Sequence, residues 1–365
     1  MSELINTFGI STLHGKQYIS MSVKFGVIGS GSWGTALVKI LTDNGNPISW
    51  WVRNPANVQY ILQRGHNPHY LTSANLKTDL LAISTDVRQV ITTSDIIVIA
   101  APSAYITDIL SSLSPEDLKN KKILSAVKGM IPQENILLNT YLEKYFNVPL
   151  SDYFAVLGPC HAEEVASEKL SYLTFSGIDT AYTQSIANYF ASSAINTVVN
   201  NDIFGVQYAA ILKNIYALGA GIAHGLDYGD NFLSVYIANS ADEMASFLKK
   251  FGAQHIVVGE HESDNEGHKS ANYAASVYLG DLLVTCYSLH SRNRMFGNMI
   301  GKGYSVQAAK LELNMVAEGY NAAKCIYNLN QQVNAEMPIA ESIYKILWEQ
   351  VPPAHGFAAI EKVLI

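Results

Sequence analysis

A glycine-rich turn near the start of the chain has the residue types of a phosphate-binding loop. It consists of Gly29, Ser30, Gly31, Ser32, Trp33 and Gly34, between an apolar strand pattern and a helical pattern. In such a turn Gly29 permits the tight bend, Gly31 lets the backbone approach a pyrophosphate and Gly34 lets the helix pack closely on the strand. The N–H groups and the dipole of a helix start attract phosphate. The turn therefore predicts a dinucleotide site, with an ordinary turn as the alternative.

The end of the second predicted strand bears on the choice of cofactor. NAD-specific sites usually carry Asp or Glu there, to bind the ribose 2′-hydroxyl. Here the strand ends in Val52-Arg53-Asn54, without an acid. A cation at this position accepts a 2′-phosphate, so NADP is predicted alongside NAD. The alternatives are that Arg53 stacks on the adenine or is a solvated strand end.

A single lysine, Lys213, interrupts an apolar helical pattern over Tyr208–Leu218. Burying a charge in such a helix is costly unless the charge has a partner or a function. Desolvation or a neighbouring cation lowers the pKa of a lysine from about 10.4 towards neutrality, and the amine can then transfer a proton. Lys213 is a candidate acid–base group. The alternative is a lysine whose stem packs while its ammonium reaches water.

Asp281 and Thr285 are four residues apart and share one face of a predicted helix. Arg292 follows Asp281 by eleven residues, which on a continuous helix returns close to the same face. The planar guanidinium of Arg292 suits phosphate, and Asn293 adds an amide donor. The set indicates an anionic substrate, a phosphate or a carboxylate. The alternative is surface ion pairing within Arg292-Asn-Arg294, where Arg294 is interpreted as structural.

Other reactive residue types are interpreted as structural. Cys286 is expected to be a small core residue, with a nucleophilic cysteine as the alternative, and Trp50 and Trp51 are expected in the core of a strand. No metal is expected, because the histidines lack the spacing of metal ligands: His161, His224, His255, His261 and His268.

The elements that must position these residues fall into two groups. From residue 22 apolar strand runs alternate with helical stretches, the pattern of a parallel α/β sheet. Runs such as Ile96–Ala100 lack alternation, which is typical of strands covered on both faces. The predicted strands are Lys24–Ile28, Ile48–Val52, Asp95–Ala101, Lys122–Val127, Phe154–Leu157, Leu170–Phe175 and Thr197–Asn200.

After residue 202 the strand signal ends, and Asp202 is a plausible N-cap for a long helix. The predicted helices are Val206–Leu218, Phe232–Phe251, Ala271–His290, Ser305–Asn328 and Pro338–Glu349. The sequence thus predicts an α/β protein: a Rossmann-like parallel-sheet domain over residues 21–201, then an all-α substrate domain over 202–365. Residues 1–20 are expected to be an appended or poorly ordered segment, and Gly252–Lys269 an exposed polar loop.

Composition excludes several classes of protein. The 365 residues are 48% hydrophobic and 15% charged, enough apolar material for sizeable cores. The net charge of −7 argues against nucleic-acid binding, and no apolar run reaches the roughly 18 residues of a membrane span. Three cysteines cannot form a disulfide framework and fit a reducing cytosol, so a cytoplasmic protein is expected. A homodimer is expected from the frequency of two-fold assemblies.

Further motifs follow the glycine turn in a specific order. They are Lys128-Gly-Met130, Gly158-Pro-Cys-His-Ala-Glu163, Leu212-Lys-Asn214, Gly229-Asp-Asn231, Gly280-Asp-Leu-Leu-Val-Thr285 and Ser291-Arg-Asn-Arg294. The ordered set, over residues 21 to about 330, resembles the soluble NAD(P)-dependent glycerol-3-phosphate dehydrogenases.

The resemblance implies a role for each matching residue. Lys213 would be the catalytic base. The substrate would be contacted by Lys128, Gly158, Cys160, Asp281, Thr285, Ser291, Arg292 and Asn293. The cofactor, NAD(H) or NADP(H), would lie along Gly29, Ser30, Gly31, Ser32, Trp33, Gly34, Arg53, Lys128, Ala162, Arg292, Val316 and Glu318.

Some positions depart from the family pattern and indicate a divergent branch. Cys160 stands where the family usually has a small hydroxyl residue. Leu233 and Ala238-Asn-Ser240 stand where a cation and a Thr-Arg-Gly-like turn are usual, and Gly252–Lys269 is longer and more acidic than expected.

The expected activity is the reversible reduction of dihydroxyacetone phosphate to sn-glycerol 3-phosphate, feeding phospholipid synthesis, with Lys213 as the proton carrier. One alternative is another lysine-dependent hydroxyacid dehydrogenase of the same two-domain plan. The other is a non-catalytic NAD-binding sensor, which the joint presence of Lys213, Lys128 and Asp281 disfavours.

Overall fold

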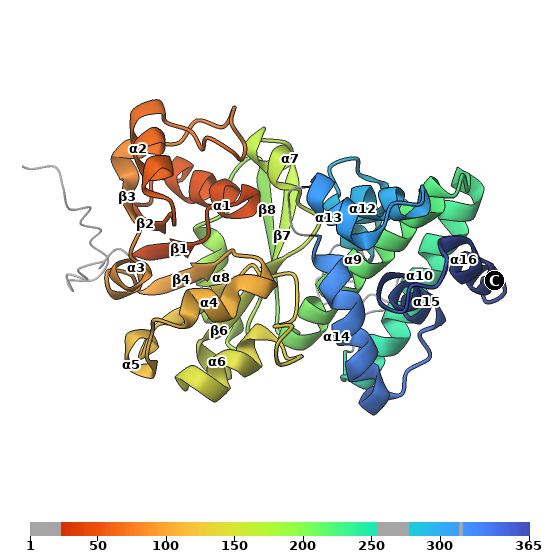
Figure 1. Cartoon of the computed structure of the whole chain (residues 1–365). Helices are drawn as coiled ribbons and strands as arrows, with labels where there is room; N and C mark the ends of the chain where they lie inside the picture. Colours follow the sequence, from red (N-terminus) through yellow and green to blue (C-terminus); the bar gives the residue numbers. More distant parts are fainter. Residues whose placement is uncertain (1–22, 254–276, 314–316) are drawn as a thin grey trace, which may run out of the picture.

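A computed structural model describes residues 23–253, 277–313 and 317–365 of the chain. Within these residues eight strands form one sheet in the order β3-β2-β1-β4-β5-β6-β7-β8 (Figure 1). Neighbouring strands are parallel except β6 and β7. The strands are β1 (Phe25–Ile28), β2 (Ile48–Trp51), β3 (Leu81–Ser84), β4 (Ile96–Ile99), β5 (Lys122–Ser125), β6 (Tyr153–Leu157), β7 (Ser171–Ser176) and β8 (Ile195–Asn200).

The central strands are buried on both faces, as their unbroken apolar runs predict. Val27 and Val98 pack into one hydrophobic cluster, whereas Ile28 and Ile99 pack into another on the opposite face of the sheet. The helices along this part of the chain are α1 (Ser32–Asp43), α2 (Pro55–Arg64), α3 (Val87–Thr92), α4 (Ile106–Leu110), α5 (Pro115–Leu118), α6 (Leu138–Phe146), α7 (Ala162–Ala166) and α8 (Thr180–Asn188).

Two features of the sheet differ from the sequence prediction. Strand β3 was not predicted: Leu81–Ser84 is a four-residue strand at the edge of the sheet, and its side chains are only partly buried. The sheet is mostly parallel, as predicted, but it contains one antiparallel pair that was not predicted, β6 and β7. A parallel crossover needs a helix long enough to return along the sheet, and α7 between these strands has only five residues.

The long helix α9 (Ile203–Gly225) is the centre of the second part of the chain (Figure 1). Asp202 is its N-cap as predicted, and the carboxylate accepts a hydrogen bond from the backbone N–H of Gly205 at 2.8 Å. Helix α12 (Arg292–Gly301) packs directly against α9: a Cβ at Gly297 would lie 1.9 Å from the carbonyl O of Leu218. Glycine at this position therefore permits the contact of the two backbones.

Further helices surround α9 and correct the predicted boundaries. The predicted helix Ser305–Asn328 is two helices, α13 (Val306–Leu313) and α14 (Glu318–Val333), and residues 314–316 between them lie outside the described residues. Helix α12 was missed because its glycines lower the helical signal, and α16 (Pro353–Glu361) was also not predicted. These helices are α10 (Asp230–Lys250), α11 (Leu279–Tyr287), α13 (Val306–Leu313), α14 (Glu318–Val333), α15 (Pro338–Trp348) and α16 (Pro353–Glu361).

Two predicted segments lie outside the described residues. They are residues 1–20 and the loop 252–269 apart from its first two residues. Among the helices of the described ranges, none has both the length and the apolar character needed to cross a bilayer.

Candidate active site

The glycine turn joins β1 to α1 at the carboxyl edge of the parallel strands, where sheets of this kind bind ligands. Gly29 has φ +123°, and a Cβ there would lie 2.5 Å from the carbonyl O of Ala100. A Cβ at Gly34 would lie 2.2 Å from the carbonyl O of Gly29, so both positions require glycine. The indole N–H of Trp50, a buried strand residue as predicted, donates to the same carbonyl at 2.9 Å.

The start of α1 has the features of a pyrophosphate cradle. Gly31 is the N-cap of α1, makes no side-chain cap and has open space on its Cβ side. The indole N–H of Trp33 is buried, and it has no hydrogen-bond partner among the residues that the structure describes. A buried donor without a partner costs free energy, which an acceptor on a ligand removes. These residues fit a dinucleotide.

A cavity of about 1160 Å³ extends from this turn along the ends of β2 and β4. Arg53 lines it from the sheet, and Lys310 and Tyr320 line it from the helical part of the chain. Trp51 also lines the cavity and is partly exposed, so its predicted place in the strand core was wrong. Arg53 and the glycine turn therefore line the same cavity.

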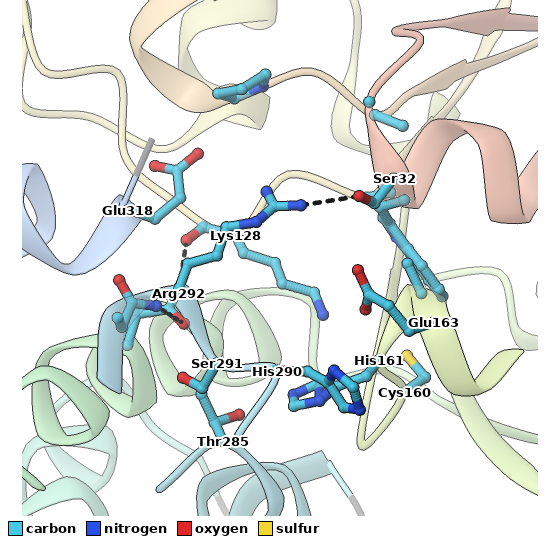
Figure 2. A pocket seen from close by; sticks show the side chains of 18 of the residues that line it. Ser32, Lys128, Cys160, His161, Glu163, Thr285, His290, Ser291, Arg292 and Glu318 are labelled. Carbon is cyan, nitrogen blue, oxygen red and sulfur yellow. Dashed lines mark hydrogen bonds between the residues drawn. The ribbon is translucent and has the colours of Figure 1, made fainter. Parts of the chain in front are cut away.

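A smaller cavity lies between the sheet and helices α9, α11 and α12 (Figure 2). Lys213 of α9 lines it and forms an ion pair with Asp281 of α11. The side chains are only 4% and 1% exposed, respectively. Burial lowers the pKa of Lys213 to about 8; the nearby charge of Lys128 acts in the same direction, whereas Asp281 opposes it. The charge in this apolar helix thus has a buried partner, Asp281.

Lys128 follows β5 and approaches the same group of charges. Its ammonium lies 5.3 Å from the centre of the Trp33 ring. Burial lowers the pKa of Lys128, but its interactions with Cys160, Asp281 and Lys213 outweigh burial and raise that pKa above its ordinary value. Of the two lysines, Lys128 therefore keeps its proton and Lys213 titrates.

Arg292 reaches the cavity by a different route from the predicted one. Helix α11 ends at Tyr287, and Ser291 starts a new helix by accepting a hydrogen bond from the backbone N–H of Arg294 at 3.3 Å. A continuous helix from Asp281 to Arg292 was therefore wrong. The chain reverses instead, and the Arg292 guanidinium donates to the hydroxyl of Ser32 at 2.9 Å (Figure 2).

A hydrogen-bond network fixes the floor of the cavity. The Asn293 amide donates to Oδ1 of Asn214 at 2.9 Å and accepts from the backbone N–H of Gly319 at 2.9 Å. Asn214 in turn donates to the carbonyl of Lys128 at 3.1 Å. The carboxylate of Glu318 accepts from the backbone N–H and the hydroxyl of Ser103 at 2.9 and 2.6 Å. This network ties α9, α12 and α14 to the sheet.

The loop after β6 forms another wall. Gly158 has φ +127°, and a Cβ there would lie 2.7 Å from the carbonyl O of Tyr172. The thiol of Cys160 donates to the carbonyl of Gly158 at 3.2 Å, and burial raises its pKa to about 11, so it is neutral at pH 7. Ala162 begins α7 and lines the cavity.

Comparisons with known proteins agree with this geometry. The family model "NAD-dependent glycerol-3-phosphate dehydrogenase N-terminus" matches residues 24–182, and the corresponding C-terminus model matches residues 202–358. "Glycerol-3-phosphate dehydrogenase [NAD(P)+]" of Bacillus subtilis (strain 168) is 32% identical over 326 residues, covering 89% of this chain and 90% of that protein. The chain belongs to this family.

A second dehydrogenase of the same name, from Thermoanaerobacter sp. (strain X514), is 32% identical over 331 residues and covers 91% of this chain and 94% of that protein. The crystal structure of glycerol-3-phosphate dehydrogenase from Coxiella burnetii has the same fold, with a TM-score of 0.83 at 23% identity; the match covers 93% of this chain and 99% of that one. Membership in the dehydrogenase family confirms the predicted enzyme class, the nicotinamide cofactor and the fold class.

Most of the residues suggested by the dehydrogenase motifs meet in these two cavities. The smaller cavity is lined by Gly31, Ser32, Trp33, Lys128, Cys160, Ala162, Lys213, Thr285, Ser291, Arg292, Asn293 and Glu318. Gly29, Ser30 and Arg53 line the larger one. Gly34, Gly158 and Asp281 line neither of the two cavities. Val316 lies outside the described residues.

Several lining residues were missed by sequence reasoning. Asn214, His161 and Glu163 line the smaller cavity, and each lies inside a motif that was noted for its neighbours. His290 precedes Ser291 and also lines this cavity. Lys310 was not identified from the sequence, because an exposed lysine on a helix gives the same sequence pattern whether or not the helix lines a cavity.

Proposed function

We propose that the chain catalyses the reversible reduction of dihydroxyacetone phosphate to sn-glycerol 3-phosphate with NADH or NADPH, and that the product supplies glycerophospholipid synthesis. The observation that carries the proposal is the buried Lys213–Asp281 pair beside a cavity that Lys128 and Arg292 also line. Reduction of a carbonyl needs a proton donor at its oxygen, and a phosphorylated substrate needs cations.

Lys213 carries the proton. A pKa of about 8 leaves the amine mostly protonated at neutral pH, ready to donate to the oxygen formed from the carbonyl. In the reverse direction the neutral amine accepts the proton of the substrate hydroxyl. Asp281 holds the amine in place, and the neighbouring charge of Lys128 favours the neutral form after transfer.

The glycine turn and the larger cavity would hold the cofactor. The start of α1, from Gly31, would bind the pyrophosphate, Arg53 the adenosine ribose, and Trp33 would donate its free N–H. When bound, the nicotinamide supplies the hydride for the carbonyl carbon. Glu318 and Arg292 would border that end of the cofactor, because both line the smaller cavity.

The N-terminal end of α12 would bind the substrate phosphate. Arg292 begins the helix, and Ser291 and Asn293 lie beside it along the cavity wall. A helix start and a guanidinium both favour an anion. Because Arg292 also donates to Ser32 of the glycine turn, substrate and cofactor would be held by one connected set of residues.

We also propose a homodimer located in the cytoplasm. The free cysteines of the described residues, Cys160, Cys286 and Cys325, are all buried, in keeping with a reducing compartment. Two-fold dimers are the commonest soluble assemblies. Light scattering on the purified protein tests the assembly, and a mass equal to that of one 39.9 kDa chain would contradict it.

The decisive experiment follows the loss of NADPH or NADH absorbance with dihydroxyacetone phosphate, beside unphosphorylated dihydroxyacetone. Lys213→Ala should lower kcat about 100-fold or more, while cofactor affinity stays within about threefold. Lys249→Ala, an exposed lysine in the last turn of α10, is the matched control and should behave as the parent.

Other outcomes identify the competing functions. Faster turnover of an unphosphorylated hydroxyacid or ketoacid would indicate a different lysine-dependent dehydrogenase. Tight cofactor binding without turnover of any of these substrates would indicate a sensor. Near-parental turnover of Lys213→Ala would contradict the assignment of the proton carrier.

A further inference from the structure

The loop after β6 and the turn between α11 and α12 meet beside the smaller cavity. Nδ1 of His161, the N-cap of α7, lies 3.0 Å from the hydroxyl oxygen of Ser288, the C-cap of α11. The rings of His161 and His290 meet edge to face with their centres 6.3 Å apart. Both rings line the cavity, and Figure 2 shows them beside each other near Lys128. The mechanism above assigns these imidazoles no role.

The hydrogen bonds around Ser288 leave one nitrogen of His161 open. The Ser288 oxygen accepts from the backbone N–H of His290 at 3.1 Å, and its hydroxyl can donate to Nδ1 of His161 when the ring carries its proton on Nε2. We assign His161 this tautomer. Nε2 makes no hydrogen bond to any residue that the structure describes. In this tautomer His161 offers an N–H donor to the cavity.

The charge state of His161 suits an anionic ligand among cations. Burial lowers the pKa of His161 to about 4, and the charges of Lys128 and Lys213 act in the same direction, so the ring is neutral at pH 7. A neutral N–H donates to an anionic oxygen without adding a third positive charge beside the two lysines.

We propose that His161 contacts the substrate phosphate, donating its Nε2–H to a phosphate oxygen while Ser288 holds the ring. The inference rests on the proposed function. Its geometric basis is that His290, which packs against His161, immediately precedes Ser291 and Arg292 at the start of α12. His161 thus borders the end of the cavity where the phosphate is expected. The phosphate is held from both sides, by Arg292 of the helical domain and His161 of the sheet domain.

Three substitutions separate a phosphate contact from a structural role. In His161→Asn the amide replaces Nδ1 and preserves the bond to Ser288 but loses the Nε2 donor. In His161→Gln the amide N–H falls near the position of Nε2 and preserves the donor. His355→Asn, an exposed histidine on α16, is the matched control.

We expect His161→Asn to lower kcat/KM for dihydroxyacetone phosphate about 10- to 100-fold, the scale of a lost hydrogen bond to a charged group. His161→Gln should stay within about fivefold of the parent, and His355→Asn should equal it. With unphosphorylated dihydroxyacetone the His161 variants should match the parent. Inorganic phosphate should inhibit His161→Asn less strongly by a similar factor, which is a second measure of the same contact.

The role of Ser288 is tested separately, as that of a positioning residue. Ser288→Ala should raise KM for dihydroxyacetone phosphate about three- to tenfold with kcat little changed, and Ser288→Thr should restore KM.

Other results overturn the inference. Parental kinetics in His161→Asn, equal losses with both substrates, or a better His161→Asn than His161→Gln would each exclude a phosphate contact through Nε2. These results leave the proposed function intact. A parent enzyme that does not reduce dihydroxyacetone phosphate would instead contradict the proposed function.

Discussion

Replacement of Asp281 by Asn is the most informative perturbation of the buried ion pair. It keeps the side-chain shape but removes the negative charge that faces Lys213, with both side chains at most 4% exposed. Removal of one partner from a buried pair generally costs about 3–5 kcal/mol, because an uncompensated charge remains. Here Lys213 can escape that cost by losing its proton.

The pKa of Lys213 limits how much stability is lost. At pH 7, neutralising an amine with a pKa of about 8 costs about 1.4 kcal/mol, and without the carboxylate that pKa falls further. We therefore expect Asp281→Asn to lower the free energy of unfolding by about 2–3 kcal/mol at pH 7. In the unfolded chain Lys213 stays protonated to about pH 10, so stability rises with pH once Lys213 loses its proton in the folded state. In the variant this loss begins at lower pH than in the parent. The deficit should be largest near pH 6 and smaller at pH 8–9.

Urea unfolding at pH 6, 7 and 9 measures this deficit. Glu341→Gln is the control, because its pair with Lys345 is exposed, with side chains 47% and 43% accessible, and should cost no more than about 0.5 kcal/mol at any pH. The rate of glycerol 3-phosphate oxidation by the parent should rise with pH, with a midpoint near pH 8. In Asp281→Asn this midpoint should lie at lower pH, and the variant should also turn over more slowly. A deficit independent of pH, or a rate midpoint that does not fall, would refute the coupling of Asp281 to the Lys213 proton.

Three more predictions follow from individual contacts. Arg292→Ala should weaken kcat/KM for dihydroxyacetone phosphate by about 2–4 kcal/mol and barely affect dihydroxyacetone; equal losses would make Arg292 a positioning residue. The kcat/KM values of the parent for NADPH and NADH should differ by no more than about tenfold. Arg53→Asp should shift the preference to NADH, which the same two kcat/KM values measure. Glu243 is buried and accepts from Tyr216 and from two N–H groups at the start of α15, and burial raises its pKa to about 7. Because the pKa of Glu243 is higher in the folded state, the parent loses stability as pH rises from 4.5 to 8, whereas Glu243→Gln does not. In thermal unfolding the free energy of unfolding of Glu243→Gln should therefore rise relative to that of the parent by up to about 3 kcal/mol over this range. A difference that does not change with pH would contradict this.

The sequence alone determined the features that depend on neighbouring residues. Strands β1 and β4 were predictable because residues buried on both faces of a sheet must all be apolar. The glycine turn was predictable because contacts such as that of Gly29 with Ala100 exclude any side chain. Asp202 marked the start of α9 because a carboxylate at an N-cap satisfies a free backbone N–H. In each case the decisive interaction is reflected in a residue type that the position requires.

Only the tertiary structure decided which distant segments meet. The guanidinium of Arg292 bonds Ser32 across 260 positions, and no periodicity in either helix predicts that contact. The end of α11 at Tyr287 brings Ser288 to His161, although the same residues read as one helix in the sequence. The short run Leu81-Ala-Ile83 does not by itself indicate a strand, and β3 is defined by its pairing with β2 at the edge of the sheet. The free energy of these contacts comes from burial and hydrogen bonding between segments far apart in the chain, so the contacts leave no local sequence pattern. For the same reason, the groups that shift the pKa of Lys213 or His161 are known only from the folded structure.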